Sequence, residues 1–136
     1  MTQSAAAYIV GIDLGTSHTL LAYAPADGSA PVTLLPIAQR LSAAEITDAP
    51  LLPSLRYQAG DGELAPQTWQ QPWPPLFASG PAPALLGRYA QELGAQVPGR
   101  LVSSAKSWLS HAGVDRAAPI LPWGAPEGVA KISPLQ

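Results

Sequence analysis

A cluster of small polar residues lies near the start of the chain, within YIVGIDLGTSHTLLAYA at residues 8–24. Asp13 is followed by Gly15, Thr16 and Ser17, so a carboxylate and two hydroxyls surround one glycine. Glycine lets the backbone approach an anion closely, and successive backbone N–H groups can donate to it together with the hydroxyls. An ionised aspartate repels phosphate unless a cation lies between them, and Mg²⁺ suits that position. The pattern is therefore typical of a site for a magnesium-bound nucleotide.

The same residues also fit a structural interpretation. In a tight turn, Thr16 and Ser17 could hydrogen-bond to their own backbone. The stretch lacks both the Gly-Lys-Ser/Thr ending of helix-borne phosphate loops and a G-x-G-x-x-G pattern. The residue types alone leave the nucleotide site and the structural turn equally open.

Two apolar runs flank the cluster and predict the strands that position it. Residues 7–13 are nearly all apolar and predict a buried strand, and residues 19–24 predict its partner. The turn-forming PADGSAP at residues 25–31 closes a hairpin, and residues 32–35 predict a third strand. The N-terminal part is expected to be a β-meander.

The next segments predict shorter elements. Residues 40–47 predict one or two turns of helix. The segment LPSLRYQAGDGEL, residues 52–64, predicts a short strand, a turn at Asp61 and Gly62, and a return strand.

Residues 66–83 are rich in proline and include QQPWPPLF. We expect an ordered, irregular surface loop anchored by Trp69, Trp73 and Phe77. The alternative is a proline-rich ligand for a partner domain. Flanking basic residues are absent and the aromatic residues suggest docking on the body of the protein, so the loop is favoured.

The C-terminal part predicts two helices. Residues 84–95 predict the first, which the Pro98-Gly99 pair ends. Its apolar face would consist of Leu85, Leu86, Tyr89, Ala90 and Leu93. A second helix is expected to begin at Ser103 or Ser104 and to end near Gly113.

The last residues predict a strand at 129–132 and then the start of a helix. Ser133 before Pro134 is N-cap and first-turn chemistry, yet the sequence ends two residues later. This favours a shortened polypeptide.

Composition narrows the class of protein. The 136 residues are 47% hydrophobic and 12% charged, with a net charge of -2, which disfavours partners such as nucleic acid and anionic membranes. There is no cysteine and there are only two histidines, so neither disulfides nor a thiolate metal site is expected. No signal peptide or membrane-spanning run is evident, and a cytoplasmic location is expected.

Three motifs carry a resemblance to a known family. VGIDLGTSHT resembles the first phosphate-binding hairpin of the actin-like ATPase superfamily, above all that of the seventy-kilodalton heat-shock (DnaK-type) chaperones. Pro53-Ser54 matches a Pro-Ser of that family before a strand. LLGRYAQELGAQVPGRLVSSAKSWL, residues 85–109, resembles its Gly-x-x-Ala helix, proline turn and Ala-Lys-Arg segment.

The resemblance implies an α/β fold, an incomplete actin-like ATPase (ribonuclease-H-like) domain of a divergent member. Residues 1–65 would form a β-rich lobe with the phosphate hairpin. Residues 66–83 would be a proline-rich insertion, and residues 84–136 a helical and irregular segment.

The resemblance also implies roles for single residues. Asp13 would hold Mg²⁺ through water, and Gly15, Thr16 and Ser17 would surround the terminal phosphates of ATP or ADP. His18 would contribute its backbone N–H, in preference to acting as a catalytic base.

Other matched positions have weaker implications. The resemblance places Gln91 at the family's catalytic lysine, and glutamine cannot supply that positive charge, so a slow or differently assisted ATPase is expected. Lys106 matches a family lysine but is interpreted as a solvated helix residue. His111 is expected at the surface.

The leading functional hypothesis is the N-terminal part of the ATP-binding domain of a DnaK-like chaperone, which couples ATP binding and hydrolysis to protein folding. Unfolded clients and co-chaperones would be partners of the whole protein. The alternatives are a non-hydrolysing nucleotide-binding scaffold and a sugar or metabolite kinase, although kinases commonly carry a cation where this chain has TLLAYA. The chain alone is expected to bind ATP weakly, to show no measurable hydrolysis and to self-associate through uncovered strands.

Overall fold

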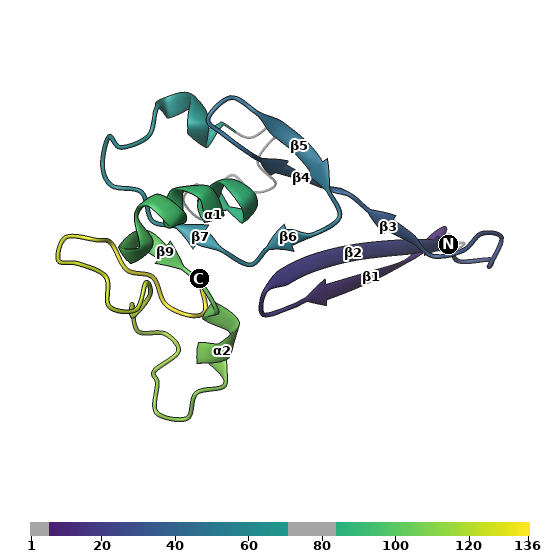
Figure 1. Cartoon of the computed structure of the whole chain (residues 1–136). Helices are drawn as coiled ribbons and strands as arrows, with labels where there is room; N and C mark the ends of the chain where they lie inside the picture. The colour runs from purple at the N-terminus through teal and green to yellow at the C-terminus, as the bar shows by residue number, and fades with distance from the viewer. Residues whose placement is uncertain (1–5, 71–83) are drawn as a thin grey trace, which may run out of the picture.

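The computed structural model describes residues 6–70 and 84–136 and shows a strand-rich arrangement with few helices (Figure 1). The strands are β1 (Tyr8–Leu14), β2 (His18–Pro25), β3 (Thr33–Leu35), β4 (Ile37–Arg40), β5 (Ile46–Ala49), β6 (Leu52–Pro53), β7 (Arg56–Tyr57), β8 (Leu85–Leu86) and β9 (Leu101–Val102). The helices are α1 (Gly87–Gln96), α2 (Ala105–Leu109) and the 3-10 turns η1 (Pro66–Trp69) and η2 (Pro98–Arg100). In the described part of the chain, no helix has both the length and the apolar character needed to cross a membrane.

The predicted β-meander is confirmed. β1 and β2 pair antiparallel from Tyr8 opposite Pro25 to Leu14 opposite Thr19, and β3 pairs with the other edge of β2. The short strand β6 also pairs with β2, which joins the loop end of the hairpin to the rest of the molecule. The β1–β2 hairpin, called the ribbon below, projects from the body at its other end (Figure 1).

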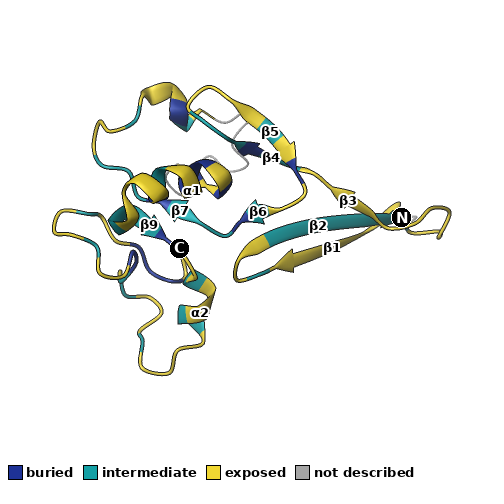
Figure 2. Ribbon diagram, viewed as in Figure 1, coloured by how far each residue is buried: buried dark blue, intermediate teal, exposed yellow. Residues whose placement is uncertain are grey.

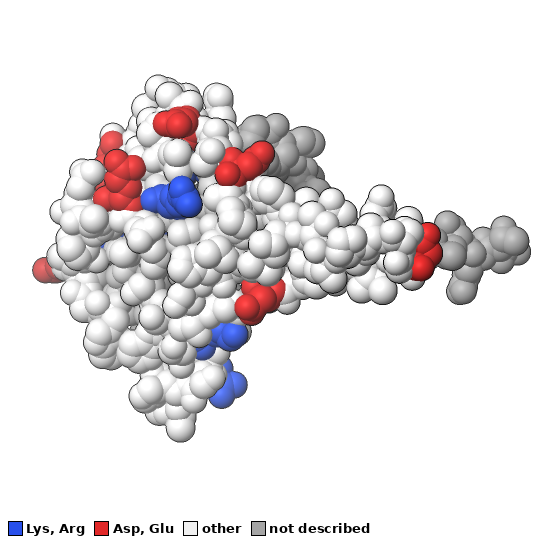
Figure 3. All heavy atoms as spheres, turned by 45° about the vertical axis from the view of Figure 1, so that its right-hand side comes forward, with Lys and Arg blue, Asp and Glu red and all other residues white. Residues whose placement is uncertain are grey.

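The ribbon is largely uncovered. Every residue of β1 is exposed, so the prediction that this strand is buried is wrong in the isolated chain (Figure 2). Ile9 and Ile12 are 64% and 62% exposed, although they point to opposite faces of the sheet. Few charged side chains lie on the face of the ribbon seen in Figure 3. β1 is thus an apolar strand at a sheet edge.

The prediction of helical turns at residues 40–47 is wrong, because β4 and β5 form a hairpin there. The Arg40 guanidinium donates to the carbonyl oxygen of Ala43 at 2.8 Å, and the Leu41 N–H donates to the carbonyl oxygen of Glu45. These bonds close a bend rather than a helical turn. The β-branched Ile46 and Thr47 also favour the strand.

The first core lies between α1 and the sheet of order β8-β7-β9. It contains Tyr57, Leu85, Tyr89 and Ala90, and Trp69 packs against it as predicted. Trp73 and Phe77, and with them the choice between a loop and a proline-rich ligand, lie outside the described residues.

The turn at Asp61 and Gly62 is confirmed, but the return strand after it is wrong. The Glu63 carboxylate accepts hydrogen bonds from the Tyr57 hydroxyl and the Gly60 N–H, both at 2.6 Å. These bonds fold the chain into a closed loop. β7 therefore pairs with the distant strands β8 and β9 instead.

α1 begins three residues later than predicted. Leu85 and Leu86 pair with β7 as a strand, although Tyr89, Ala90 and Leu93 pack toward the core as expected. Gly87 has φ +71°, and a Cβ there would lie 2.6 Å from Leu52 Cδ1. This glycine lets the chain turn from β8 into α1 against β6.

The C-terminal segment packs on a second core of Val102, Leu121 and Ile132, with Trp108 beside them. The predicted strand at 129–132 is wrong, since Leu121 and Ile132 form only an isolated bridge. Prolines stand on both sides of this bridge, at 119, 122 and 134, and cannot donate hydrogen bonds to extend a ladder. After Ser133 the chain forms a turn, closed by the Gln136 N–H on the Ser133 carbonyl.

Candidate functional site

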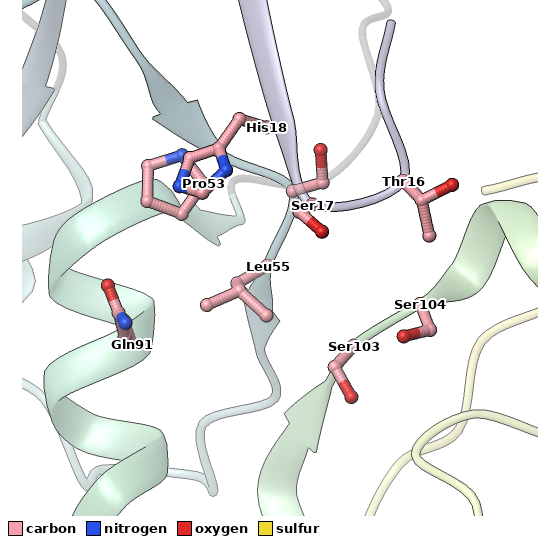
Figure 4. Close-up of a pocket in the computed structure, with 9 residues that line it drawn as sticks. Thr16, Ser17, His18, Pro53, Leu55, Gln91, Ser103 and Ser104 are labelled. Atoms are coloured by element: carbon pink, nitrogen blue, oxygen red, sulfur yellow. The ribbon is translucent and has the colours of Figure 1, made fainter.

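An open cavity of about 230 Å³ lies where the loop of the ribbon meets the body (Figure 4). The hairpin loop forms one side, β6 and α1 contribute further walls, and the connection from β9 to α2 faces the loop. The lining residues are Thr16, Ser17, His18, Pro53, Ser54, Leu55, Gln91, Ser103 and Ser104.

Most of the residues predicted to form a site lie around this cavity. Thr16, Ser17 and His18 line it from the hairpin, and Gln91 lines it from α1. Asp13 does not line it: the residue is exposed on β1, opposite Leu20. The cavity thus lies between the hairpin loop and α1. Asp13 lies on β1, two residues before Gly15 of the loop.

Gly15 determines the shape of the hairpin loop. A Cβ at this position would lie 2.4 Å from the carbonyl oxygen of His18, which is shorter than any allowed contact. Only glycine therefore fits where the loop backbone approaches the His18 carbonyl so closely. This close approach sets the direction of the Thr16–Ser17 backbone.

Ser54 fastens the loop to the body. Its hydroxyl donates to the carbonyl oxygen of Gly15 at 3.0 Å, and its backbone N–H donates to that of Ser17 at 2.8 Å. The preceding Pro53 pairs with His18 and is buried. Pro53 and Ser54 thus attach the hairpin loop to the body through strand pairing and two hydrogen bonds.

Lys106 bonds to the end of β1, next to the loop. The residue is exposed, as a solvated helix residue would be, but its ammonium donates to the carbonyl oxygen of Leu14 at 2.6 Å. This bond connects α2 to the last residue of β1. Lys106 is thus an exposed helix residue, as predicted, that in addition bonds to the end of β1.

The polar groups that line the cavity are neutral amides and hydroxyls together with the imidazole of His18. None of the described lining residues is Asp, Glu, Lys or Arg. Gln91 can donate and accept hydrogen bonds but carries no charge. An anion bound here would be held by neutral donors and would need its compensating charge from a bound cation.

His18 lies beside Pro53, its partner in the β2–β6 pairing (Figure 4). Among the described residues, none accepts a hydrogen bond from its imidazole. A general base is normally oriented by such a partner. His18 is exposed, and its backbone is part of the β2–β6 pairing.

Ser103 and Ser104 are site residues that the sequence motifs did not reveal. Both serines are exposed, lie in the connection between β9 and α2, and line the cavity. Ser104 has φ 53° and ψ 27°, a left-handed conformation that costs a non-glycine residue about 1 kcal/mol. Ser104 occupies the N-cap position of α2, but its side chain makes no capping bond, so that predicted cap is absent.

The residues are compatible with a magnesium ion held mainly by its ligand and by water. Within residues 6–70 and 84–136, no three His, Cys, Asp or Glu side chains gather to form a protein-built metal site. Mg²⁺ commonly takes one or two carboxylates, several waters and the phosphate oxygens of its substrate. Asp13 offers one exposed carboxylate next to the hairpin loop, outside the lining of the cavity.

The chain matches no protein-family model, and no curated protein and no solved structure matches it. A functional assignment therefore depends on the motif residues and on the geometry of the cavity.

Proposed function

We propose that this chain is the phosphate-binding part of the ATP-binding domain of a DnaK-like chaperone. One observation carries the proposal: Thr16 and Ser17 share one cavity with Gln91, the position of the family's catalytic lysine. The hairpin, the Pro-Ser pair and the helix, which resemble the family as separate motifs, all contribute to its walls. Clients and co-chaperones would then be partners of the whole protein.

The size of the cavity supports phosphate groups as the part of the nucleotide that is bound. Pockets for drug-sized ligands measure roughly 300–1,000 Å³, and this cavity of about 230 Å³ is smaller. It suits two or three phosphoryl groups better than a whole nucleotide. The adenosine would make few contacts with this chain, and weak binding of ATP follows.

Each residue of the site would have its own part in binding the phosphates and the magnesium ion. The hydroxyls of Thr16 and Ser17 and the loop N–H groups would donate to phosphate oxygens. Asp13 would hold a magnesium ion through water, and that ion would neutralise phosphate charge. Ser54 and Lys106, through their bonds to Gly15 and Leu14, would keep the loop in its binding conformation.

The neutral lining also favours a second candidate, a nucleotide-binding scaffold that does not hydrolyse ATP. Phosphoryl transfer depends on positive charge at the transferring group, and Gln91 supplies none. The variant Gln91→Lys separates the two. A gain in hydrolysis indicates an ATPase that has lost its lysine, whereas unchanged inactivity favours the scaffold.

The binding proposal is tested by titrating the chain with Mg-ATP, Mg-ADP and Mg-AMP in a calorimeter or by nuclear magnetic resonance. Affinity should fall from ATP to AMP, because the phosphates make the contacts. Thr16→Ala should weaken ATP binding several-fold, and the exposed Thr33 on β3 provides the control Thr33→Ala. Equal affinity for ATP and AMP, or no binding of any nucleotide, would disprove the proposal.

A further inference from the structure

We infer that Ser103 and Ser104 are a second set of phosphate-binding hydroxyls, opposite Thr16 and Ser17. This inference rests on the proposed function and deepens it. The sequence predicts only the start of a helix at these two serines and no contact with a ligand. The evidence is their position, their backbone conformation and the chemistry of the cavity.

The backbone segment that carries the two serines lies opposite the hairpin loop, and both residues line the cavity between them. They belong to the connection between β9 and α2, and Figure 4 shows this connection opposite Thr16 and Ser17. The Lys106 ammonium, two residues after Ser104, bonds to the carbonyl oxygen of Leu14. The connection and the loop are therefore held at a defined separation, as two walls of one binding site must be.

The backbone of Ser104 is unusual for a serine. Ser104 has a φ of 53°, and among the described residues it is the single non-glycine residue with a positive φ. Glycine or asparagine adopts this conformation at lower cost. The Ser104 hydroxyl also makes no capping bond to α2. The hydroxyl is therefore free to contact a ligand, and no local structural role accounts for serine here.

The cavity chemistry points to a phosphoryl group as the ligand. Its described lining offers hydroxyls and an amide but no charged side chain. Hydroxyls donate to phosphate oxygens and rotate to suit them. The oxygens of a tetrahedral phosphoryl group diverge, so one group can bond to both walls at once. A planar carboxylate presents its two oxygens to one side and would reach one wall.

The test measures binding of magnesium tripolyphosphate and Mg-ATP to the whole chain by calorimetry. The variants are Ser103→Ala, Ser104→Gly and the double variant. Ser104→Gly removes the hydroxyl and relieves the backbone, so the variant should fold at least as well as the natural chain. Ser110→Ala, at the exposed end of α2, is the control.

Each substitution should weaken binding of both ligands by roughly tenfold, the effect of losing one hydrogen bond to a charged group. Ser103→Thr, which keeps a hydroxyl, should retain most of the affinity, and Ser110→Ala should bind normally. Normal binding by Ser104→Gly and Ser103→Ala, with weaker binding by Thr16→Ala, would overturn this inference and leave the proposed function standing. Failure of the natural chain to bind either ligand would overturn both.

Discussion

The hydroxyl of Ser54 donates a hydrogen bond to the carbonyl oxygen of Gly15, 39 residues earlier in the chain, at 3.0 Å. The Ser54 backbone N–H also donates to the carbonyl oxygen of Ser17, so Ser54 holds the hairpin loop at two points. A loop held in this way keeps its hydroxyls and N–H groups in position before a ligand arrives, which lowers the entropic cost of binding.

Replacing Ser54 with alanine should loosen the loop. The lost hydrogen bond should lower the free energy of unfolding by about 1 kcal/mol, and Mg-ATP should bind several-fold more weakly. Urea denaturation and calorimetric titration measure the two effects. Ser110→Ala is the matched control, and a Ser54→Ala chain with unchanged affinity would show that the fastening does not matter for binding.

Alanine at Gly15 should be far more damaging than alanine at Gly11. At Gly15 the new Cβ would meet the His18 carbonyl oxygen at 2.4 Å, whereas at Gly11 the nearest atom, the Ala22 carbonyl oxygen, is 4.0 Å away. We expect Gly15→Ala to cost roughly 1–3 kcal/mol of stability and to abolish the proposed nucleotide binding. Gly11→Ala should leave both close to normal. Equal effects of the two substitutions in thermal denaturation would contradict the close approach.

The response of Asp13→Asn should depend on magnesium. With Mg²⁺ present, the variant should bind ATP several-fold more weakly, because a carboxylate that orders the ion's water shell is lost. With the metal removed by a chelator, the natural chain should bind ATP poorly and Asp13→Asn slightly better, since a repulsive charge is gone. Asp48→Asn, on the exposed part of β5, should behave like the natural chain. Equal losses with and without the metal would argue against a role toward the ion.

Stability should fall at alkaline pH through Tyr57. Burial, the hydrogen bond to Glu63 and the charge of that carboxylate raise the pKa of Tyr57 to about 12, although Arg100 opposes the change. Because the folded pKa lies above the ordinary value of 10.0, this stability is complete below pH 10 and is lost as the pH rises toward 12. The size of the loss is set by the difference between the folded and unfolded pKa values of Tyr57. Denaturant midpoints across this range measure it, with Tyr23→Phe as control and Tyr57→Phe expected to remove this contribution.

The hydrogen bond between Tyr57 and Glu63 should also make stability depend on pH in acid, through the Glu63 carboxyl. Burial alone would raise the pKa of Glu63, but the hydrogen bonds from Tyr57 and Gly60 and the charge of Arg100 together lower it. The resulting stability is present above the ordinary pKa of 4.5 and is lost as the pH falls through the lower folded value. In Tyr57→Phe the acid loss should move to higher pH. An unchanged acid limb in that variant would show that the Tyr57 bond does not affect the carboxyl.

The uncovered β1 should make the chain self-associate. Apolar residues at a free sheet edge promote pairing with another strand, and Val10 and Ile12 are 59% and 62% exposed. Size-exclusion chromatography at several concentrations should show a species that grows with concentration. Val10→Lys should shift it toward the monomer, and Thr33→Lys, on the exposed strand β3, is the control. A monomer at every concentration would contradict this prediction.

The sequence predicted the elements that depend on local signals. The ribbon followed from its apolar runs and turn residues, and the core positions of α1 followed from helical spacing at Tyr89 and Ala90. The predictions were wrong where contacts between residues distant in the sequence determine the secondary structure. Leu85 and Leu86 suit a helix by spacing but pair with β7, and Glu63 folds its segment into a loop through Tyr57.

The candidate site was predictable in part for the same reason. The hairpin motif marked Thr16 and Ser17, and the family resemblance marked Gln91. Ser103 and Ser104 reach the cavity only through the packing of the β9–α2 connection, so no local spacing could identify them. The bond from Lys106 to Leu14 likewise joins residues that are 92 positions apart.

The two walls of the cavity come from the ribbon and from the β9–α2 connection, which belong to different sheets and to opposite halves of the chain. A ligand that bonds to both walls would therefore connect them, and after its release the described contacts of the ribbon near the loop would be those with β6, Ser54 and Lys106. Occupancy of the cavity and the tilt of the ribbon would then be two readouts of one equilibrium. A probe at the distant tip of the ribbon would report on binding at its base.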